Sequence, residues 1–169
     1  MFMKKIIHLA LIFSLIIVAA GCSDSDIENN AMEIVTNFKK SQYEIDDYKK
    51  IPNEESYQYF AEKGKGYLTE EEFDNMMANR NFGIVGDLAK NKNLNTFVSD
   101  FKVKEKKREE EQISFKYEMM VNFKNELDEI QHQVPVNGEV ELIKTKDNEL
   151  KINRDWDDLI KNIPVELRE

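Results

Sequence analysis

The chain has 169 residues, of which 41% are hydrophobic and 34% are charged, with a formal net charge of −9 and a single cysteine. One cysteine excludes an internal disulfide and a thiolate zinc cluster, and the hydrophobic content excludes a disordered chain. The acidic balance argues against nucleic-acid binding, which requires a basic face.

Residues 1–21 have the layout of a secretory signal peptide. Two lysines precede the apolar stretch 6–20, which is shorter than the roughly 20 residues of a membrane-spanning helix. Small residues then lead to the cysteine, and Val18-Ala19-Ala20-Gly21-Cys22 resembles the lipobox of bacterial lipoproteins. The resemblance implies that the Cys22 sulfur receives a diacylglyceryl group, that residues 1–21 are removed, and that the new amino group is acylated. Simple secretion, with Cys22 either lost or left as a free thiol, is the alternative.

Removing this leader, which holds two lysines and no acid, leaves 148 residues with a net charge of −11. We expect the membrane to be contacted through lipidated Cys22 only, because an acidic domain is repelled by an anionic lipid surface. Residues 22–30 are then the lipidated cysteine and a polar tether, and 31–169 form one domain. The outer leaflet of a Gram-positive cell is the preferred location, although Ser23 also permits outer-membrane sorting in a cell with two membranes.

Helical periodicity begins at Ala31, with Asn30 as the expected N-cap. A second, short helix is expected around Tyr57–Ala61. Thr69 and Glu72 predict a capping box that starts a third helix, and a further helical turn is expected at 84–88.

Beyond about Thr96 the period changes from 3.6 to 2, which predicts strands. The charged run 104–111 is interpreted as a solvated hairpin tip. The clearest alternation follows it, with apolar residues at every second position from Ile113 to Phe123. Further strands are expected over 130–142 and from Leu150 to Trp156, so that an antiparallel meander follows the helices. The sequence thus predicts an α+β fold, with N-terminal helices packed on a curved, long-stranded antiparallel sheet.

Two segments resemble the N-terminal NTF2-like domain of penicillin-binding transpeptidases. They are Ile34–Phe73, which includes Tyr67-Leu68-Thr69-Glu70-Glu71-Glu72-Phe73, and Leu150–Pro164, which contains a strand, a tryptophan turn and a proline. The resemblance implies an NTF2-like cone over residues 31–169. Leu150 stands where that family has a tryptophan, and no transpeptidase domain follows in this sequence. We therefore expect a stand-alone extracytoplasmic module without that enzymatic activity.

Three residues are candidates for a pocket inside the cone. His132 is the only histidine after the leader, and its phase could direct it inward as a general base. Tyr117 could donate a hydrogen bond to a ligand, although an alternating apolar row favours a core position. Trp156 could border a pocket, although packing at the sheet end is the favoured interpretation.

No metal or cofactor is predicted. The acidic groups Asp24/Asp26, Asp46/Asp47 and Asp155/Asp157/Asp158 lack the spacing of a calcium loop and are interpreted as solvated faces. Neither a transition-metal set nor a phosphate or dinucleotide motif is present in the sequence.

We therefore expect a non-enzymatic, lipid-anchored binding module of the cell envelope, whose partner is an envelope protein or a small ligand. The alternatives are a small NTF2-like pocket enzyme of isomerase or hydrolase type, motivated by His132 and Tyr117, and an immunity or exclusion lipoprotein. The sequence leaves the oligomeric state open.

Overall fold

The computed structural model describes residues 24–52, 56–109 and 111–169. Contacts divide the chain into two units, 1–30 and 31–169. The second unit holds the whole sheet and every described helix except the first seven residues of α2. Cys22 and the predicted signal peptide lie outside the described residues.

Helix α2 spans Asp24–Tyr43 and is the longest helix of the described residues. Its buried side chains include Ala31, Val35 and Phe38, which confirms the predicted apolar stripe. The predicted start is wrong, because the helix already runs through residues 24–30 and Asn30 is not an N-cap. Acidic residues are favoured in the first turns of a helix by the macrodipole, so the polar composition of 24–30 is compatible with helix as well as with a tether.

Shorter helices follow α2 along the chain. They are η2 (Tyr48–Lys50), α3 (Ser56–Gly64), η3 (Lys65–Tyr67), α4 (Glu70–Ala78) and α5 (Ile84–Lys92). At the start of α4, Thr69 accepts a hydrogen bond from the Glu72 N–H at 3.2 Å, as a capping box requires. The reciprocal half does not form, because the Thr69 N–H donates to the Ile152 carbonyl.

Four antiparallel strands form one sheet in the order β1-β2-β3-β4. They span Asn95–Arg108, Gln112–Lys124, Ile130–Lys144 and Leu150–Asp157. The six alternating apolar residues of β2 are all buried, at 0–3% exposure, which confirms the sequence prediction. Two short helices, α6 (Leu159–Asn162) and α7 (Val165–Arg168), close the chain.

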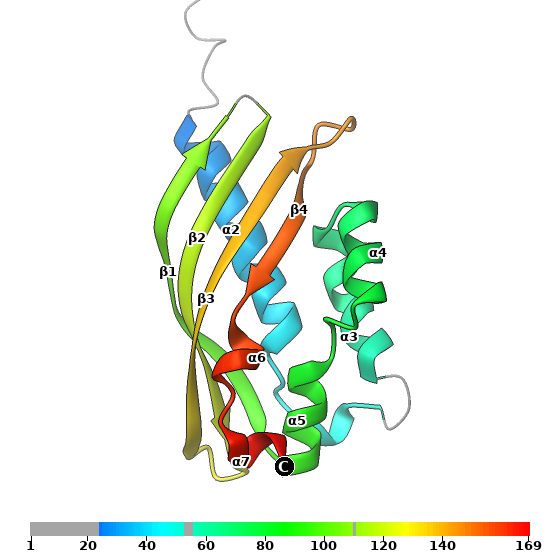
Figure 1. Cartoon of the computed structure of the whole chain (residues 1–169), viewed down its shortest axis with the longest axis vertical. Coiled ribbons are helices and arrows are strands. Elements are labelled where there is room, and N and C mark those ends of the chain that lie inside the picture. Colours follow the sequence, from blue (N-terminus) through cyan, green and yellow to red (C-terminus); the bar gives the residue numbers. More distant parts are fainter. Residues whose placement is uncertain (1–23, 53–55, 110) are drawn as a thin grey trace, which may run out of the picture. The chain divides into compact units, whose positions relative to one another are not determined.

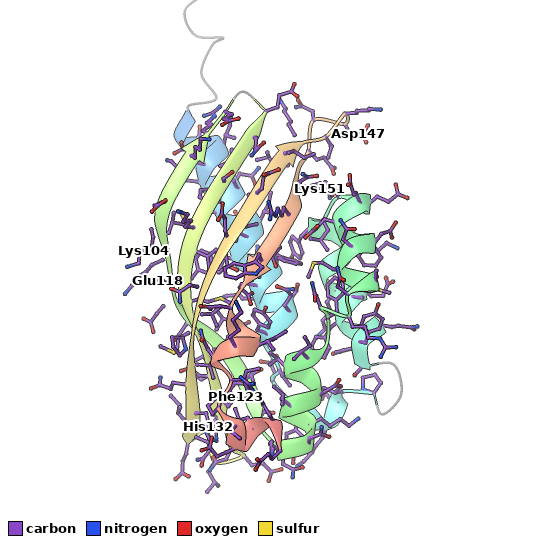
Figure 2. The ribbon with its side chains drawn as sticks, in the orientation of Figure 1. Lys104, Glu118, Phe123, His132, Asp147 and Lys151 are labelled. Atoms are coloured by element: carbon purple, nitrogen blue, oxygen red, sulfur yellow. The ribbon has the colours of Figure 1, made fainter. Side chains whose placement is uncertain are left out.

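Residues 104–108 of the charged run are strand, which corrects the sequence interpretation, while 109 and 111 lie between β1 and β2 as expected of a hairpin tip. β1 continues to Arg108, which pairs with Ile113. Cross-strand ion pairs on the solvent face account for this, since Lys104 and Glu118 approach to 2.8 Å (Figure 2). Opposite charges on paired strands stabilise the pairing of polar sequence.

Residues 31–43 of α2 lie along one face of the sheet, and α3, α4 and α5 stand to one side beyond β4 (Figure 1). Leu68 forms a parallel bridge with Ile152, and this bridge covers part of the β4 edge. The arrangement confirms the α+β class, with helices against a long-stranded antiparallel sheet. Among the described helices, none combines the length and apolar character needed to cross a membrane.

Candidate binding site

One extra residue in β4 determines which side chains of this strand face the interior. Leu142 pairs with Ile152, but the next residue of β3 in the ladder, Glu141, pairs with Arg154, so Asn153 is a bulge. Beyond a bulge the inward phase moves by one residue. Asp155 and Asp157 therefore point inward, with side chains only 5% and 8% exposed. The interpretation of these two aspartates as a solvated face is wrong.

Lys39 of α2 lies between the two carboxylates and has a fully buried side chain. Its ammonium is 2.7 Å from Asp155 Oδ2 and 2.8 Å from Asp157 Oδ2. Burial alone would lower the pKa of Lys39, but the charges of the two aspartates outweigh burial and raise the pKa above its usual value. The lysine is therefore a permanent interior cation at physiological pH.

Aromatic rings surround the ammonium of Lys39. The centroids of the Phe38, Tyr43 and Tyr117 rings are 5.4–5.5 Å from Nζ, within the range of cation–π attraction. These contacts replace part of the hydration that the ammonium loses on burial.

Asp157 has hydrogen-bond donors at both of its oxygens. Oδ2 accepts from the Tyr43 hydroxyl at 2.7 Å in addition to Lys39, and Oδ1 accepts from the Leu159 N–H at 3.1 Å. Burial alone would raise the pKa of Asp157, but Lys39 and these donors outweigh burial and lower it. The negative charge of this carboxylate is thus well compensated.

Asp155 is less well compensated. Its Oδ2 accepts from Lys39, but its buried Oδ1 has no hydrogen-bond partner among the described residues. Burial, together with the nearby Asp157 charge, raises the pKa of Asp155 to about 6 in spite of the attraction of Lys39. Its backbone N–H donates to Glu72 Oε1 at 2.9 Å, which ties β4 to α4. One ammonium therefore serves two carboxylates, and Asp155 is the partner left with a free oxygen.

Lys39, Asp155 and Asp157 together form the Lys39 cluster. A pocket of about 350 Å³ adjoins it, between the end of α2, the α4–α5 connection and the β4–α6 junction. Its lining includes a buried set of side chains and an exposed set. The buried set is Gln42, Tyr43, Met76, Asp155, Asp157 and Leu159. The exposed set is Asn81, Trp156, Ile160 and Lys161. Like Asp155 Oδ1, Gln42 Oε1 is buried and lacks a partner in the described part of the chain.

Of the three residues proposed from the sequence, only Trp156 lines this pocket. It is 52% exposed, because the bulge turns it outward, and the Lys161 ammonium lies 5.5 Å from its ring centroid. The favoured interpretation of Trp156 as packing at the sheet end does not fit this exposure.

His132 and Tyr117 lie elsewhere. His132 is half-buried and pairs with Phe123 near the β2–β3 hairpin (Figure 2). Tyr117 is 1% exposed and stacks on Phe101 with centroids 5.2 Å apart. Its hydroxyl faces Gly138, where a Cβ would collide with it, and has no hydrogen-bond partner among the described residues. Tyr117 is therefore a core residue beside the Lys39 cluster.

Sequence reasoning did not select Lys39, Gln42 or Asp155 for the site. One signal was present, since Lys39 follows Val35 by four residues and so lies on the apolar side of the helix. A lysine in that position requires an interior anion. Within the described ranges, no three His, Cys, Asp or Glu side chains converge to hold a metal ion.

Comparison with known proteins identifies relatives by fold only. No family model matches the chain, and no curated protein matches its sequence. Solved structures do match. One is a periplasmic fragment of TraM, with a TM-score of 0.51 and 10% identity, covering 77% of this chain and 96% of that one. Another is an IcmL-like type IV secretion system protein from Legionella pneumophila, with a TM-score of 0.56 and 11% identity, covering 82% and 94%.

The periplasmic domain of DotI is similar to the same extent, with a TM-score of 0.54, 13% identity and coverage of 83% of this chain and 98% of that one. At 10–13% identity these likenesses establish a shared fold and carry no residue of one site onto another.

Proposed function

We propose that the chain is a lipid-anchored, extracytoplasmic module of NTF2-like fold that binds another protein of the cell envelope. The main support is the fold of residues 31–169, which resembles structures described as periplasmic parts of TraM and DotI and a type IV secretion system protein. The signal-peptide layout ending at Cys22 supports the same side of the membrane independently.

The anchor consists of acyl chains on Cys22. Each buried CH₂ contributes roughly 0.8 kcal/mol, so two or more acyl chains hold a protein firmly while one chain binds reversibly. We place the protein on the outer leaflet of a Gram-positive membrane, with the acidic domain held away from the lipid surface. In this arrangement the domain is free to contact a membrane-bound partner from the side.

Substitution of Cys22 tests the anchor. Cys22→Ala should move the protein from the membrane fraction to the medium or periplasm, whereas Ser23→Ala, one residue on, should leave it in the membrane fraction. Unchanged partitioning of the Cys22→Ala protein would refute lipid anchoring.

Cross-linking in intact cells tests the partner. A photoreactive amino acid at Ile160, which is 53% exposed beside the pocket, should capture a distinct envelope protein. The matched control is the same amino acid at Leu127, which is 77% exposed in the β2–β3 hairpin. If neither position captures a protein and deletion of the gene alters no envelope phenotype, the binding function is wrong.

The alternative of a small pocket enzyme was based on His132 and Tyr117, and neither residue lines the pocket. We therefore carry forward the binding function.

A further inference from the structure

Two acceptor atoms make the pocket beside the Lys39 cluster chemically specific. Gln42 is 4% exposed and the Asp155 side chain is 5% exposed, and both line the pocket. Gln42 Oε1 and Asp155 Oδ1 have no hydrogen-bond partner among the described residues. A buried acceptor without a donor costs free energy, and a protein commonly retains one where a ligand or an ordered water supplies the donor.

The charge around these atoms favours a cation. Lys39 is shared by two carboxylates, and Asp157 also receives the Tyr43 hydroxyl and the Leu159 N–H. With both aspartates ionised, the buried cluster has a net charge of −1, and the uncompensated oxygen is Asp155 Oδ1. An anion would be repelled by this net negative charge, and two of the three N–H donors of Lys39 are already bonded to the aspartates.

The remaining lining suits a short hydrocarbon chain. Met76, Ile84, Leu159 and Ile160 are apolar and line the same pocket. A volume of about 350 Å³ is at the lower end of ligand pockets, which favours one side chain or a small amine over a nucleotide. Alkyl chains with a charged end bury their methylenes against such walls.

We infer that this pocket binds an alkylammonium or alkylguanidinium group, whose N–H groups donate to Gln42 Oε1 and Asp155 Oδ1 while its methylenes contact the apolar wall. The group belongs either to a lysine or arginine side chain of a partner protein or to a free small amine. If the group is a side chain of a partner protein, the inference specifies how the proposed binding function works and rests on that function. If the group is a free amine, the inference is independent of the proposed function.

Binding is measurable with the full chain purified in a mild detergent, because Trp156 is the only tryptophan and lines the pocket. The probes are butylammonium, its neutral isostere butanol, and N-acetyl-arginine amide, which represents a partner side chain. Tryptophan fluorescence should show saturable binding of at least one cationic probe, with butanol weaker by about tenfold or more, because charge-assisted hydrogen bonds are the stronger ones.

The probes also separate the two sources. Tighter binding of N-acetyl-arginine amide assigns the pocket to a partner side chain, whereas exclusive binding of butylammonium assigns it to a free amine, and either outcome supports the inference. No response to any cationic probe would mean that water alone occupies the pocket. Equal responses to butanol and butylammonium would mean an apolar cavity without cation preference. Each of these two outcomes overturns the inference, whatever the anchoring and cross-linking experiments give.

Three variants at the pocket and one control variant test the residues. Gln42→Leu and Asp155→Asn should each weaken cation binding by about tenfold, since each removes one acceptor or charge. Lys161→Ala should strengthen binding at low salt, because it removes a like charge from the pocket rim. Lys151→Ala, near the start of β4 and outside the pocket lining, should have no effect. Thermal unfolding checks that each variant is folded. Unchanged binding by folded Gln42→Leu and Asp155→Asn, or weaker binding by Lys161→Ala, would refute the assignment.

Discussion

Replacing Lys39 with methionine would leave two carboxylates in the interior without a cation. Removing one partner of a buried charge network typically costs about 3–5 kcal/mol, because the remaining charge has lost both water and its counter-ion. Both Lys39 contacts are 2.8 Å or shorter and its side chain is fully buried, so we expect the full range to apply. Against a total stability of about 5–15 kcal/mol for a single domain, Lys39→Met removes a large part of the free energy of unfolding.

Urea unfolding of the full chain in mild detergent, followed by far-UV circular dichroism, measures this loss. The matched control is Lys49→Met, which breaks an ion pair with Glu126 at 2.6 Å whose side chains are 63% and 59% exposed. An exposed pair is screened by solvent and contributes little to stability, so the control should unfold close to the native protein. Combining Lys39→Met with Asp155→Asn and Asp157→Asn should recover part of the loss, because the uncompensated charge is then absent.

The loss should also depend on pH. Without Lys39, burial raises the folded-state pKa of both carboxyls above the unfolded value of about 3.9. A carboxyl with a raised folded pKa destabilises the folded state when it is ionised. The loss of unfolding free energy in Lys39→Met is therefore full near pH 7 and shrinks as the pH falls toward about 4. Equal small losses in Lys39→Met and Lys49→Met, or a deficit independent of pH, would refute the account of Lys39 as the counter-ion of a buried acidic pair.

Three further comparisons test the same region and the helical layer. Tyr43→Phe should lower the free energy of unfolding by about 1.5–3 kcal/mol, because a hydrogen bond to a buried carboxylate is lost. Tyr117→Phe should be nearly neutral, because the Tyr117 hydroxyl has no partner among the described residues. Similar losses for the two variants in urea unfolding would contradict this. Asp155 has a folded pKa of about 6, above its usual 3.8, so its contribution to stability is present below pH 3.8 and is lost as the pH rises through 6. The native protein should therefore gain on the order of 3 kcal/mol over Asp155→Asn as the pH falls through that window, and a constant difference would exclude the raised pKa. Gly86→Ala places a Cβ against a buried phenyl ring and should cost about 1–3 kcal/mol although alanine favours helix, while Gly66→Ala meets no atom within 4 Å and should unfold within about 0.5 kcal/mol of the native protein.

Most of the fold was predictable because local pattern and tertiary packing agree over long segments. Ile113–Phe123 alternates without interruption, and only a strand with one buried face satisfies that pattern. Thr69 marked the start of α4 correctly because an N-cap is a local interaction. The second half of the expected capping box failed because Glu72 receives a donor from β4, which no local rule includes.

The errors at the element ends have two physical causes. Residues 104–108 have the composition of a loop but remain strand, because opposite charges face one another across β1 and β2. Residues 24–30 have the composition of a tether but are helical, because acidic side chains are compatible with a helix N-terminus. In both segments polarity alone did not distinguish a loop from a solvated element.

The candidate site was missed for a third reason, which is a single bulged residue. A period of two carried through Asn153 places Trp156 inside and both aspartates outside, whereas the bulge reverses these positions. Two features of the sequence together indicate that the alternation of β4 is interrupted. Lys39 lies on the apolar side of α2 and needs an interior anion, and Asp155 and Asp157 have the spacing that places two carboxylates on one face of a strand. A shift of phase between Ile152 and Asp155 is needed to bury the apolar start of β4 and also to bring both carboxylates to Lys39. The position of Lys39 is therefore the observation from which the bulge could have been inferred.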